Sequence, residues 1–314
     1  MADVEAILEK ELGERLQKNV SLREYVSIGV GGMADFFFIA KNIDELAKCV
    51  MLANELKLTY CILGGGYNVV PSDSGFPGIV IKNESNNVAF SGDNSQVIVD
   101  SGVSVGKLIN LAASRYFGGL EFLFGVPGTV GGAVYGNAGA FSYEIGDFVK
   151  SVILLLPKED GEMAVVNKLC EWFDFSYRSS KLKTDYNSEK FKPIILTVKL
   201  QLVKRRKNEI LGLMQQNMAR KKDAQPLNEK SAGSFFKNPD TNSETTAGYL
   251  LDKSGVKKLK VGGAAFSKQH ANFLVNRKNA SASDVRKLAE KAKDLVKDRF
   301  NVDLEEEVEY IGKW

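Results

Sequence analysis

The stretch YCILGGGYNVVPSD, residues 60–73, places three consecutive glycines directly after a short apolar run. The apolar run is typical of a buried strand, and the residues after Tyr67 are turn formers rather than the start of a helix. A dinucleotide-binding fold needs GxGxxG between a strand and a helix, and a Walker loop needs GK[ST], whereas Tyr67 follows Gly66 here. Both familiar phosphate motifs therefore fail on their context.

A third way of holding a phosphate remains open for Gly64, Gly65 and Gly66. Consecutive backbone N–H groups in a glycine turn form a concave nest for an anion without any helix. Glycine permits the positive φ of such a turn and lets a diphosphate approach the backbone, and Asn68 offers a further side-chain donor. A tight turn between two strands explains the same residues, so both interpretations stay open at this point.

A second glycine-dense region, EFLFGVPGTVGGAVYGNAGAF, occupies residues 121–141. Its Pro-Gly pair predicts a turn, after which Thr129 is suited to cap a helix that begins at Val130. Inside that helix, Gly131 and Gly132 each cost roughly 1 kcal/mol relative to alanine. The pattern fits close packing of another helix, or a flat ring or diphosphate against bare backbone. Two such regions together favour a bound nucleotide cofactor.

Composition limits the classes of function. The 314 residues suffice for about two domains of ~150 residues each. With 44% hydrophobic and 26% charged residues the chain is a folded protein, and its net charge of +3 is too balanced to indicate nucleic acid or membrane as partner. No apolar run approaches the roughly 18 residues that span a bilayer. Nothing in the sequence points to an obligate protein partner.

Two further counts bear on location and chemistry. The acidic, amphipathic N-terminus is not a signal peptide, and Cys49, Cys61 and Cys170 are far apart with no CxxC, so we predict reduced thiols and a cytoplasmic location. His270 is the only histidine, which makes a zinc site improbable, and we predict no metal. We interpret His270 as a structural hydrogen-bonding residue. Catalysis then depends on Arg, Lys, Ser, Tyr, Glu or a cofactor.

In the first half of the chain, predicted helices alternate with predicted strands, the pattern of a mixed α/β domain. The triplet Phe36–Phe38 is expected in the core, and the basic run KRRK at 204–207 reads as the solvated start of a helix or a linker face. The predicted helices are 3–17, 43–56, 104–116, 204 to about 222, 244–253 and 283–297, and the predicted strands are 36–40, 60–63, 79–81, 96–99, 151–156, 194–202, 273–275 and 302–311.

Five motifs stand in an order that resembles the bacterial UDP-N-acetylenolpyruvoylglucosamine reductases. The resemblance covers about residues 25–312, nearly the whole chain. Its glycine motifs are shared by many flavoproteins of the vanillyl-alcohol-oxidase type, whereas SAGSFFKNP together with YRSS is much more specific. The motifs are LGGGYNVVPSD (63–73), LEFLFGVPGTVGGAVYGNAGAF (120–141), FSYRSS (175–180), SAGSFFKNP (231–239) and LEEEVEYIG (304–312).

The resemblance implies an α+β fold with a two-part FAD-binding domain of the vanillyl-alcohol-oxidase type, followed by a smaller α/β substrate-binding domain. On this basis we expect an N-terminal helical segment over 1–24 and an FAD-binding domain over 25–203, divided into 25–83 and 84–203. The substrate-binding domain then comprises 204–314. No tyrosine-bearing insertion occurs between Arg178 and Ser234, which indicates the shorter type of the family.

FAD is the cofactor that the resemblance implies, with NADPH as co-substrate. Its diphosphate is expected on the first glycine turn and its isoalloxazine near the second glycine region. The family usually has serine where this chain has Tyr67. A contact between the cofactor and the backbone is compatible with this replacement, whereas a contact through the serine side chain is not. The expected cofactor-binding residues are Gly64, Gly65, Gly66, Tyr67, Asn68, Gly125, Val126, Pro127, Gly128, Thr129, Gly132, Asn137 and Gly139.

The resemblance also implies the reaction: reduced flavin delivers hydride to an enolpyruvyl ether, and negative charge develops beside the carboxylate. By motif match Arg178 is the cation that grips this carboxylate, because a planar guanidinium makes two parallel hydrogen bonds to it. Ser234 matches the proton donor, with Ser231 as a nearby competitor. Lys237 and Asn238 are expected to contact the substrate. Which of Arg220, Lys221 and Lys222 meets a phosphate stays open.

The third catalytic residue shows a conflict between two kinds of reasoning. Period-two alternation places Val302, Leu304, Glu306, Val308 and Tyr310 on one face of a strand, which favours Glu306 as the inward carboxylate. The family pattern L-x-x-E-V selects Glu307 instead. Both hold if the apolar face packs on the domain while the opposite face lines the cleft, and we select Glu307.

The expected function is therefore NADPH-dependent reduction of UDP-N-acetylglucosamine enolpyruvate to UDP-N-acetylmuramate for peptidoglycan. Two alternatives remain at this stage. One is another flavin oxidoreductase of the same fold, such as a hydroxyacid oxidase, in which the three matched side chains have no such role. The other is a nucleotide-binding module without catalysis.

Overall fold

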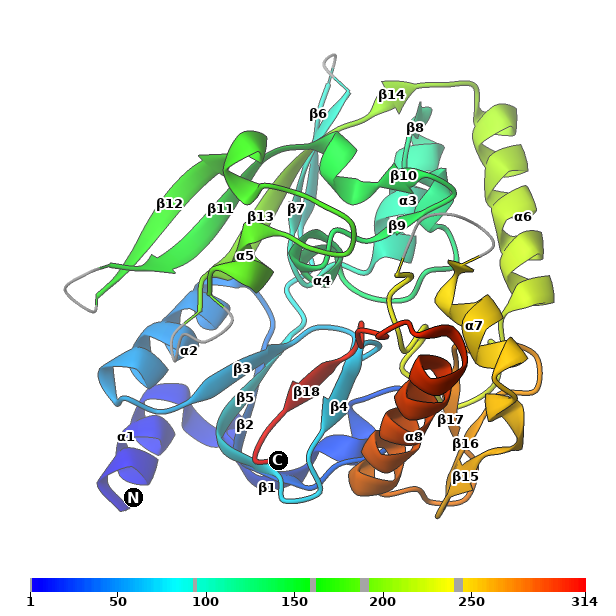
Figure 1. Cartoon of the computed structure of the whole chain (residues 1–314). Coiled ribbons are helices and arrows are strands. Elements are labelled where there is room, and N and C mark those ends of the chain that lie inside the picture. Colours follow the sequence, from blue (N-terminus) through cyan, green and yellow to red (C-terminus); the bar gives the residue numbers. More distant parts are fainter. Residues whose placement is uncertain (1, 93–94, 159–161, 187–191, 240–244) are drawn as a thin grey trace. The chain divides into compact units, whose positions relative to one another are not determined.

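The computed structural model describes residues 2–92, 95–158, 162–186, 192–239 and 245–314 (Figure 1). The chain forms two compact units, each assembled from three stretches. Unit 1 comprises Met1–Lys18, Phe36–Gly65 and Gly78–Ala219, and unit 2 comprises Asn19–Asp35, Gly66–Pro77 and Arg220–Trp314. The chain thus passes from unit 1 to unit 2 within the first glycine turn, between Gly65 and Gly66.

A four-stranded sheet with the order β1-β2-β5-β3 supports one core of unit 1. Strands β3 and β5 pair in parallel, with Tyr60 opposite Ile79. Phe36 and Phe38 pack on the apolar side of α2 and Phe37 is fully buried, which confirms the triplet as core. The elements are β1 (Gln17–Ser21), β2 (Met33–Ala40), β3 (Tyr60–Leu63), β5 (Phe76–Asn83), α1 (Ala2–Leu12) and α2 (Ile43–Glu55).

The second sheet of unit 1 has five antiparallel strands in the order β12-β11-β13-β7-β6. Its apolar residues form one core with α3 and α4, so the second glycine region belongs to this layer. The elements are β6 (Val88–Ser91), β7 (Gln96–Asp100), α3 (Val105–Ser114), α4 (Val130–Tyr135), β11 (Val149–Pro157), β12 (Met163–Leu169), α5 (Lys181–Thr184) and β13 (Ile194–Gln201), with the short pairs β8 (Phe117–Gly118) and β14 (Val203–Lys204), β9 (Gly139–Ala140) and β10 (Tyr143–Glu144).

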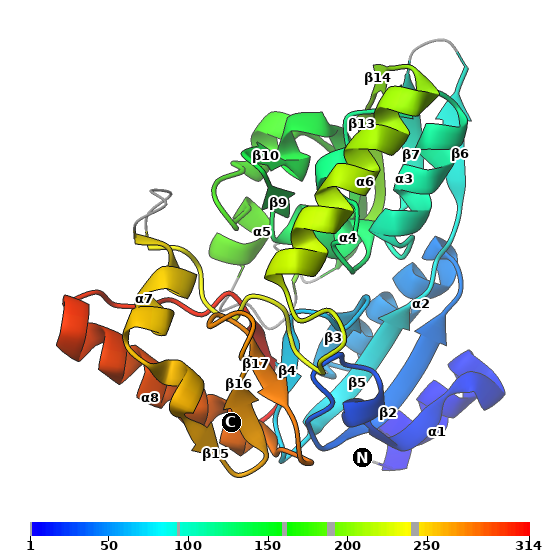
Figure 2. The ribbon, with the colours of Figure 1, turned by 90° about the vertical axis from the view of Figure 1, so that its right-hand side faces the viewer.

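In unit 2, the long helix α8 lies beside a three-stranded sheet of order β15-β16-β17 (Figures 1 and 2). The parallel pair β18 and β4 joins the C-terminal segment to the residues that follow the first glycine turn. The elements are β4 (Val69–Pro71), α7 (Ala247–Lys253), β15 (Lys260–Val261), β16 (Ala264–Phe266), β17 (Leu274–Asn276), α8 (Ala282–Phe300) and β18 (Glu309–Ile311), and α6 (Lys207–Ala224) contains the boundary at Ala219.

Short polar residues determine where several helices begin. Thr129 accepts a hydrogen bond from the backbone N–H of Gly132 and thereby caps α4, as the sequence predicts. Ser281 and Asp284 form a capping box at α8. Asp73, from the turn sequence after the glycines, accepts from the backbone N–H groups of Ala282 and Ser283, at 2.8 Å each. The start of α8 is therefore fixed by two separate carboxylates.

The predicted N-terminal helix and the predicted C-terminal strand are both shorter in the structure. The N-terminal helix ends at Leu12 instead of residue 17, because Gly13 adopts a φ of +67° that terminates a right-handed helix. The predicted strand 302–311 is reduced to Glu309–Ile311, preceded by one isolated bridge between Phe236 and Glu306. Alternation alone predicted a longer ladder than the available neighbouring strands provide.

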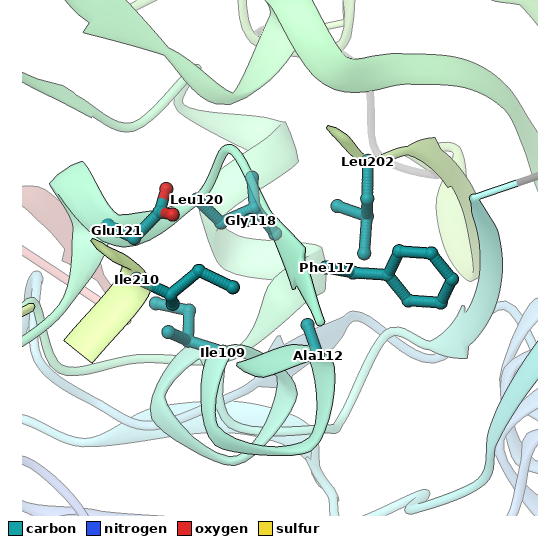
Figure 3. Close-up of a pocket in the computed structure, with 8 residues that line it drawn as sticks. All are labelled: Ile109, Ala112, Phe117, Gly118, Leu120, Glu121, Leu202 and Ile210. Atoms are coloured by element: carbon teal, nitrogen blue, oxygen red, sulfur yellow. The ribbon is translucent and has the colours of Figure 1, made fainter. Parts of the chain in front are cut away.

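The basic run at 204–207 has a mixed environment. Lys204 lies in β14 and α6 begins only at Lys207, so the expected helix start at 204 was wrong, while the solvated character holds for Lys204, Arg206 and Lys207. Arg205 instead pairs with the buried carboxylate of Glu121, at 3.1 Å. Figure 3 shows this carboxylate at the edge of a narrow apolar gap lined by Ile109, Ala112, Phe117, Gly118, Leu120, Leu202 and Ile210.

The described residues meet neither of two requirements, one for crossing a membrane and one for holding a metal ion. None of the helices within them combines the length and apolar character that crossing a membrane requires. They also contain no group of three or more His, Cys, Asp and Glu side chains arranged to hold a metal ion.

Candidate active site

The first half of the glycine turn belongs to unit 1, where it meets the second glycine region. A Cβ atom added to Gly64 would lie 2.5 Å from Oγ1 of Thr129, so only glycine fits at this approach. The ammonium group of Lys82, on β5, donates a hydrogen bond to the carbonyl oxygen of Gly64. Burial lowers the pKa of Lys82 from its ordinary value. The two glycine motifs are thus brought together at the end of β3, where Gly64 meets Thr129, 65 positions later in the sequence.

The second half of the turn belongs to unit 2. Gly66 has a φ of +71°, and a Cβ atom there would lie 2.1 Å from the carbonyl oxygen of Tyr25. Within the described part of the chain, the backbone N–H groups of Gly65, Gly66 and Tyr67 have no hydrogen-bond acceptor. Three consecutive N–H groups without an internal acceptor are what an anion nest requires. Tyr67 itself is 44% exposed.

Asn68 has a partner that sequence reasoning did not anticipate. Its side-chain amide donates to the carbonyl oxygen of Glu307 at 2.9 Å. Its main-chain carbonyl oxygen accepts a hydrogen bond from the N–H of Glu309 at 2.8 Å. The expected side-chain donor is therefore engaged within unit 2. It ties the glycine turn to the segment that carries the predicted catalytic glutamate.

The glycines of the second region differ in their surroundings. Gly131 packs against Ser101, because a Cβ atom there would lie 2.8 Å from the Cβ of that serine. Gly128, at φ +133°, has nothing within 4 Å of such a Cβ, and at Gly132 the nearest atom is Oγ1 of Thr129 at 3.5 Å. Close packing therefore explains Gly131, while Gly128 and Gly132 leave bare backbone next to open space. Gly125 also has a positive φ, of +78°.

Arg178 lies in a tight turn of unit 1. Ser176 and Ser179 exchange two main-chain hydrogen bonds around it, and Arg178 has a φ of +54°. Its Nη2 donates to the carbonyl oxygen of Gly139 at 2.8 Å, and its guanidinium lies 5.1 Å from the ring centre of Tyr177. The predicted cation therefore lies against the end of the second glycine region.

Asn137, expected to bind the cofactor, has protein partners instead. The residue has no exposed surface, and its amide bonds to Glu144, to the carbonyl of Ser176 and to the N–H of Gly146. The expectation of a cofactor contact at Asn137 remains a prediction.

In unit 2, Ser234 and Glu307 lie on adjacent segments. The N–H of Glu307 donates to the carbonyl oxygen of Phe235, the residue after Ser234, at 2.8 Å. The neighbouring N–H of Lys237 donates to the carbonyl oxygen of Glu305, also at 2.8 Å. Two of the three predicted catalytic residues are thus brought together, whereas Arg178 belongs to the other unit and its approach to them remains a prediction.

One of the two candidate glutamates, Glu306, has an ion-pair partner in unit 2. The carboxylate of Glu306 forms an ion pair with Lys293 of α8, at 3.5 Å. Glu306 therefore serves the packing of α8 on the C-terminal segment. The selection of Glu307 for the site rests on the motif match and remains a prediction.

The expected substrate contacts also have partners in unit 2. Lys237, whose side chain is 15% exposed, forms an ion pair with the exposed Glu305. The side chain of Asn238 accepts from the N–H of Ala247 at 3.0 Å, at the start of α7. Both side chains belong to the segment that carries Ser234. Their contact with substrate is not tested by these bonds and remains a prediction.

The remaining candidates divide by burial. Lys221 is only 6% exposed, and burial lowers its pKa to about 8, whereas Arg220 and Lys222 are exposed. His270 accepts a hydrogen bond from the N–H of Asn272 and stacks edge-on against Phe273, consistent with the structural role expected for it. Burial lowers the pKa of His270.

Comparison with known proteins identifies the family. The chain is 37% identical over 311 residues to UDP-N-acetylenolpyruvoylglucosamine reductase 1 of Bacillus cereus, covering 99% of each chain, and 34% identical to the Bacillus subtilis enzyme, covering 98% of each. The solved structure of UDP-N-acetylenolpyruvylglucosamine reductase from Thermus caldophilus matches with a TM-score of 0.77 at 33% identity, over 95% of this chain and 99% of that one. The chain belongs to the UDP-N-acetylenolpyruvoylglucosamine reductase family.

Two family models match separate parts of the chain. Residues 34–167 match an FAD binding domain, and residues 225–311 match the C-terminal domain of UDP-N-acetylenolpyruvoylglucosamine reductase. The first range contains both glycine regions, and the second contains Ser234 and Glu307. These matches confirm the α+β fold and the family that the motifs predicted. Sequence reasoning missed Lys82, Asn68 as a clamp on Glu307, and the contacts of Asn137, because no local pattern specifies a long-range partner.

Proposed function

We propose that this protein is the NADPH-dependent flavoenzyme that reduces the enolpyruvyl group of UDP-N-acetylglucosamine enolpyruvate and so forms UDP-N-acetylmuramate, a peptidoglycan precursor. The observation that carries the proposal is the family relationship over essentially the whole chain, at 37% identity and 99% coverage. The matched motifs supply each group that the reaction needs. A cytoplasmic location, where NADPH is available, belongs to the same proposal.

The residues present fit an FAD. Three consecutive N–H groups at Gly65, Gly66 and Tyr67 suit a diphosphate, and the bare backbone at Gly128 and Gly132 leaves room for a flat ring. The Lys82 ammonium adds positive charge beside the turn. When bound, the flavin accepts hydride from NADPH and passes it to the enolpyruvyl double bond.

Arg178 is proposed to bind the carboxylate of the enolpyruvyl group. Negative charge develops next to this carboxylate as the double bond is reduced, and a guanidinium stabilises it through two charge-assisted hydrogen bonds. One correctly placed donor of this kind contributes about 2.7–4 kcal/mol to transition-state stabilisation. The hydrogen bond from Nη2 to Gly139 holds the group in place within unit 1.

Ser234 is proposed to donate the proton that completes the reduction. A hydroxyl is a weak acid, so its surroundings must lower the cost of the transient alkoxide. Glu307 lies on the adjacent segment and is proposed to polarise the developing intermediate or to act as an acid. Lys237 and Asn238, three and four positions after Ser234, are proposed to bind the substrate. Lys221 is our candidate among the three cations of α6 for a buried phosphate contact.

The domain division is a further proposal. We retain an N-terminal segment 1–24, an FAD-binding domain 25–203 in two parts, 25–83 and 84–203, and a substrate-binding domain 204–314. The matched ranges 34–167 and 225–311 lie within the second and third of these.

The test is an anaerobic flavin titration of the purified protein. We expect a yellow preparation whose flavin absorption is bleached by NADPH and returns when UDP-N-acetylglucosamine enolpyruvate is added without oxygen. UDP-N-acetylglucosamine, which lacks the enolpyruvyl group, is the matched control and should leave the flavin reduced. A flavin that stays reduced when the enolpyruvyl substrate is added would indicate another flavin oxidoreductase, and a colourless protein that cannot be loaded with FAD would indicate a non-catalytic binding module.

A further inference from the structure

Asn137 is the most completely engaged polar side chain near the predicted arginine. It has no exposed surface and a φ of +44°, a left-handed conformation that asparagine tolerates better than most residues. Its Nδ2 donates to Oε2 of Glu144 at 2.6 Å and to the carbonyl of Ser176 at 2.9 Å. Its Oδ1 accepts from the N–H of Gly146 at 3.0 Å. One buried amide therefore joins two separate stretches of unit 1.

The stretch that Asn137 holds is the turn around Arg178. Side-chain hydrogen bonds join this turn to residues 135–146. Besides the bond from Asn137, Nη2 of Arg178 donates to the carbonyl of Gly139 at 2.8 Å, and Oγ of Ser180 donates to the carbonyl of Tyr135 at 2.6 Å. Asn137 is anchored further through its hydrogen bond to Glu144.

Glu144 is itself fixed. Its N–H donates to Oδ2 of Asp147 at 3.1 Å, in a capping box at the short helical turn that follows. The carboxylate therefore has a defined place from which to accept the Asn137 amide. A donor pair and an acceptor on one planar group match this site, and no other uncharged side chain apart from glutamine offers both.

We propose that Asn137, oriented by Glu144, is a positioning residue. It fixes the turn around Arg178 relative to residues 135–146, so that the guanidinium is correctly placed for the substrate carboxylate. The inference rests on the proposed function, in which Arg178 binds that carboxylate. Misplacement of a binding group by about 1 Å costs roughly 10²-fold in rate. An amide that fixes the turn through Ser176 and the base of the loop through Gly146 is placed to prevent such a shift.

The test compares two buried amides of unit 1. Asn137→Asp keeps the shape but loses the donors and places a carboxylate against Glu144. The control is Asn217→Asp: Asn217 is 8% exposed, and its amide donates to the carbonyl of Glu121, away from the arginine turn. Both variants are expected to lower the thermal midpoint. Only Asn137→Asp is expected to raise KM for the enolpyruvyl substrate or lower kcat, by roughly 10²-fold in kcat/KM, while reduction of the bound flavin by NADPH keeps its rate.

A rescue separates positioning from simple destabilisation. Two carboxylates at hydrogen-bond distance share one proton readily, so lowering the pH from 8 to 6 is expected to recover part of the Asn137→Asp activity. The other titratable groups near this amide are Asp147 and Cys170, whose thiol donates to the carbonyl of Gly146 and has its pKa raised by burial, and the permanently charged Arg178. The double variant with Glu144→Gln removes the repulsion between the two carboxylates but leaves the Ser176 carbonyl without its donor, so it is expected to recover only part of the activity without the pH change.

Three results would overturn the proposal. The first is an unchanged kcat/KM in Asn137→Asp. The second is an equal loss of kcat/KM in Asn217→Asp, which would reduce the role of Asn137 to stability. The third is loss of flavin from Asn137→Asp in proportion to the activity, which would assign Asn137 to the cofactor. Failure of the wild-type protein to turn over would instead contradict the proposed function, so the two failures are distinguishable.

Discussion

The arginine turn of unit 1 and the serine segment of unit 2 are held in opposite ways. The turn around Arg178 contacts residues 135–146 through side chains, with Asn137 as the anchor. The segment around Ser234 is held mainly by its backbone: Phe235 receives a bond from Glu307 and donates one to the carbonyl of Asn272, and Lys237 donates to Glu305. A site group held by side chains depends on individual residue identities, whereas one held by backbone tolerates more substitution around it.

The difference bears on what each group is proposed to do. A guanidinium that binds a substrate carboxylate has to match the fixed geometry of that substrate, and side-chain hydrogen bonds determine the position of the guanidinium. A proton donor has to stay beside one carbon atom, and a backbone ladder holds it rigidly. Each arrangement thus predicts a different response to mutation.

The largest expected effect is on Ser234 itself. Ser234→Ala removes the proposed proton donor, and general acid catalysis of this kind contributes roughly 10²- to 10⁴-fold. We expect reoxidation of the reduced flavin by substrate to slow by that factor. Reduction by NADPH should keep its rate, because it does not use this proton. Stopped-flow absorbance of the two half-reactions measures both.

Ser231→Ala is the matched control for this variant, three residues earlier in the same segment. Its carbonyl accepts a hydrogen bond from Ser27 and its backbone bridges Val275, so the substitution leaves the segment in place. If Ser231→Ala slowed reoxidation and Ser234→Ala did not, the motif match would have selected the wrong serine.

The next effect concerns stability rather than chemistry. Asn272 mimics a strand neighbour for Phe236, accepting from its N–H at 2.9 Å and donating to its carbonyl at 2.8 Å. Asn272→Ala leaves two buried backbone groups unpaired, which costs about 1–3 kcal/mol each. We expect urea unfolding to show this loss, while kcat/KM falls less than in Asn137→Asp because the backbone bonds to Glu307 and Asn272 remain.

A larger fall in kcat/KM for Asn272→Ala than for Asn137→Asp would contradict the comparison. It would mean that the serine segment also depends on one amide, and that its backbone bonds are insufficient.

Much of the fold was predictable because it depends on local chemistry. Apolar periodicity located α2, α3 and α8, and Thr129 was recognisable as a cap, since these features need only neighbouring residues. The short strand β4 was missed, because three residues carry no alternation and its pairing with β18 joins distant parts of the sequence. Pattern also overextended the strand at 302–311, where neighbouring strands and not side chains set the limit.

The site divides in the same way. The motifs predict Arg178, Ser234 and Glu307 as site residues by chemical type and order, and the structure places the latter two on adjacent segments. The hydrogen bonds that hold these segments were not predictable, since the sequence around Asn68 or Asn137 does not specify a partner at Glu307 or Ser176. A buried amide with long-range partners is recognised only once the chain is folded.

The smallest expected effect tests the edge of the serine segment. Lys237 pairs with Glu305, whose side chain is 72% exposed, and such exposed ion pairs contribute about 0–1 kcal/mol. Lys237→Gln should therefore leave the urea midpoint almost unchanged. If Lys237 contacts the substrate as proposed, KM should rise roughly tenfold, the cost of one charged hydrogen bond. Glu305→Gln breaks the same ion pair but keeps the lysine, so it should leave KM unaltered. Equal KM values in both variants would show that Lys237 only pairs with Glu305, and that the backbone alone defines this part of the site.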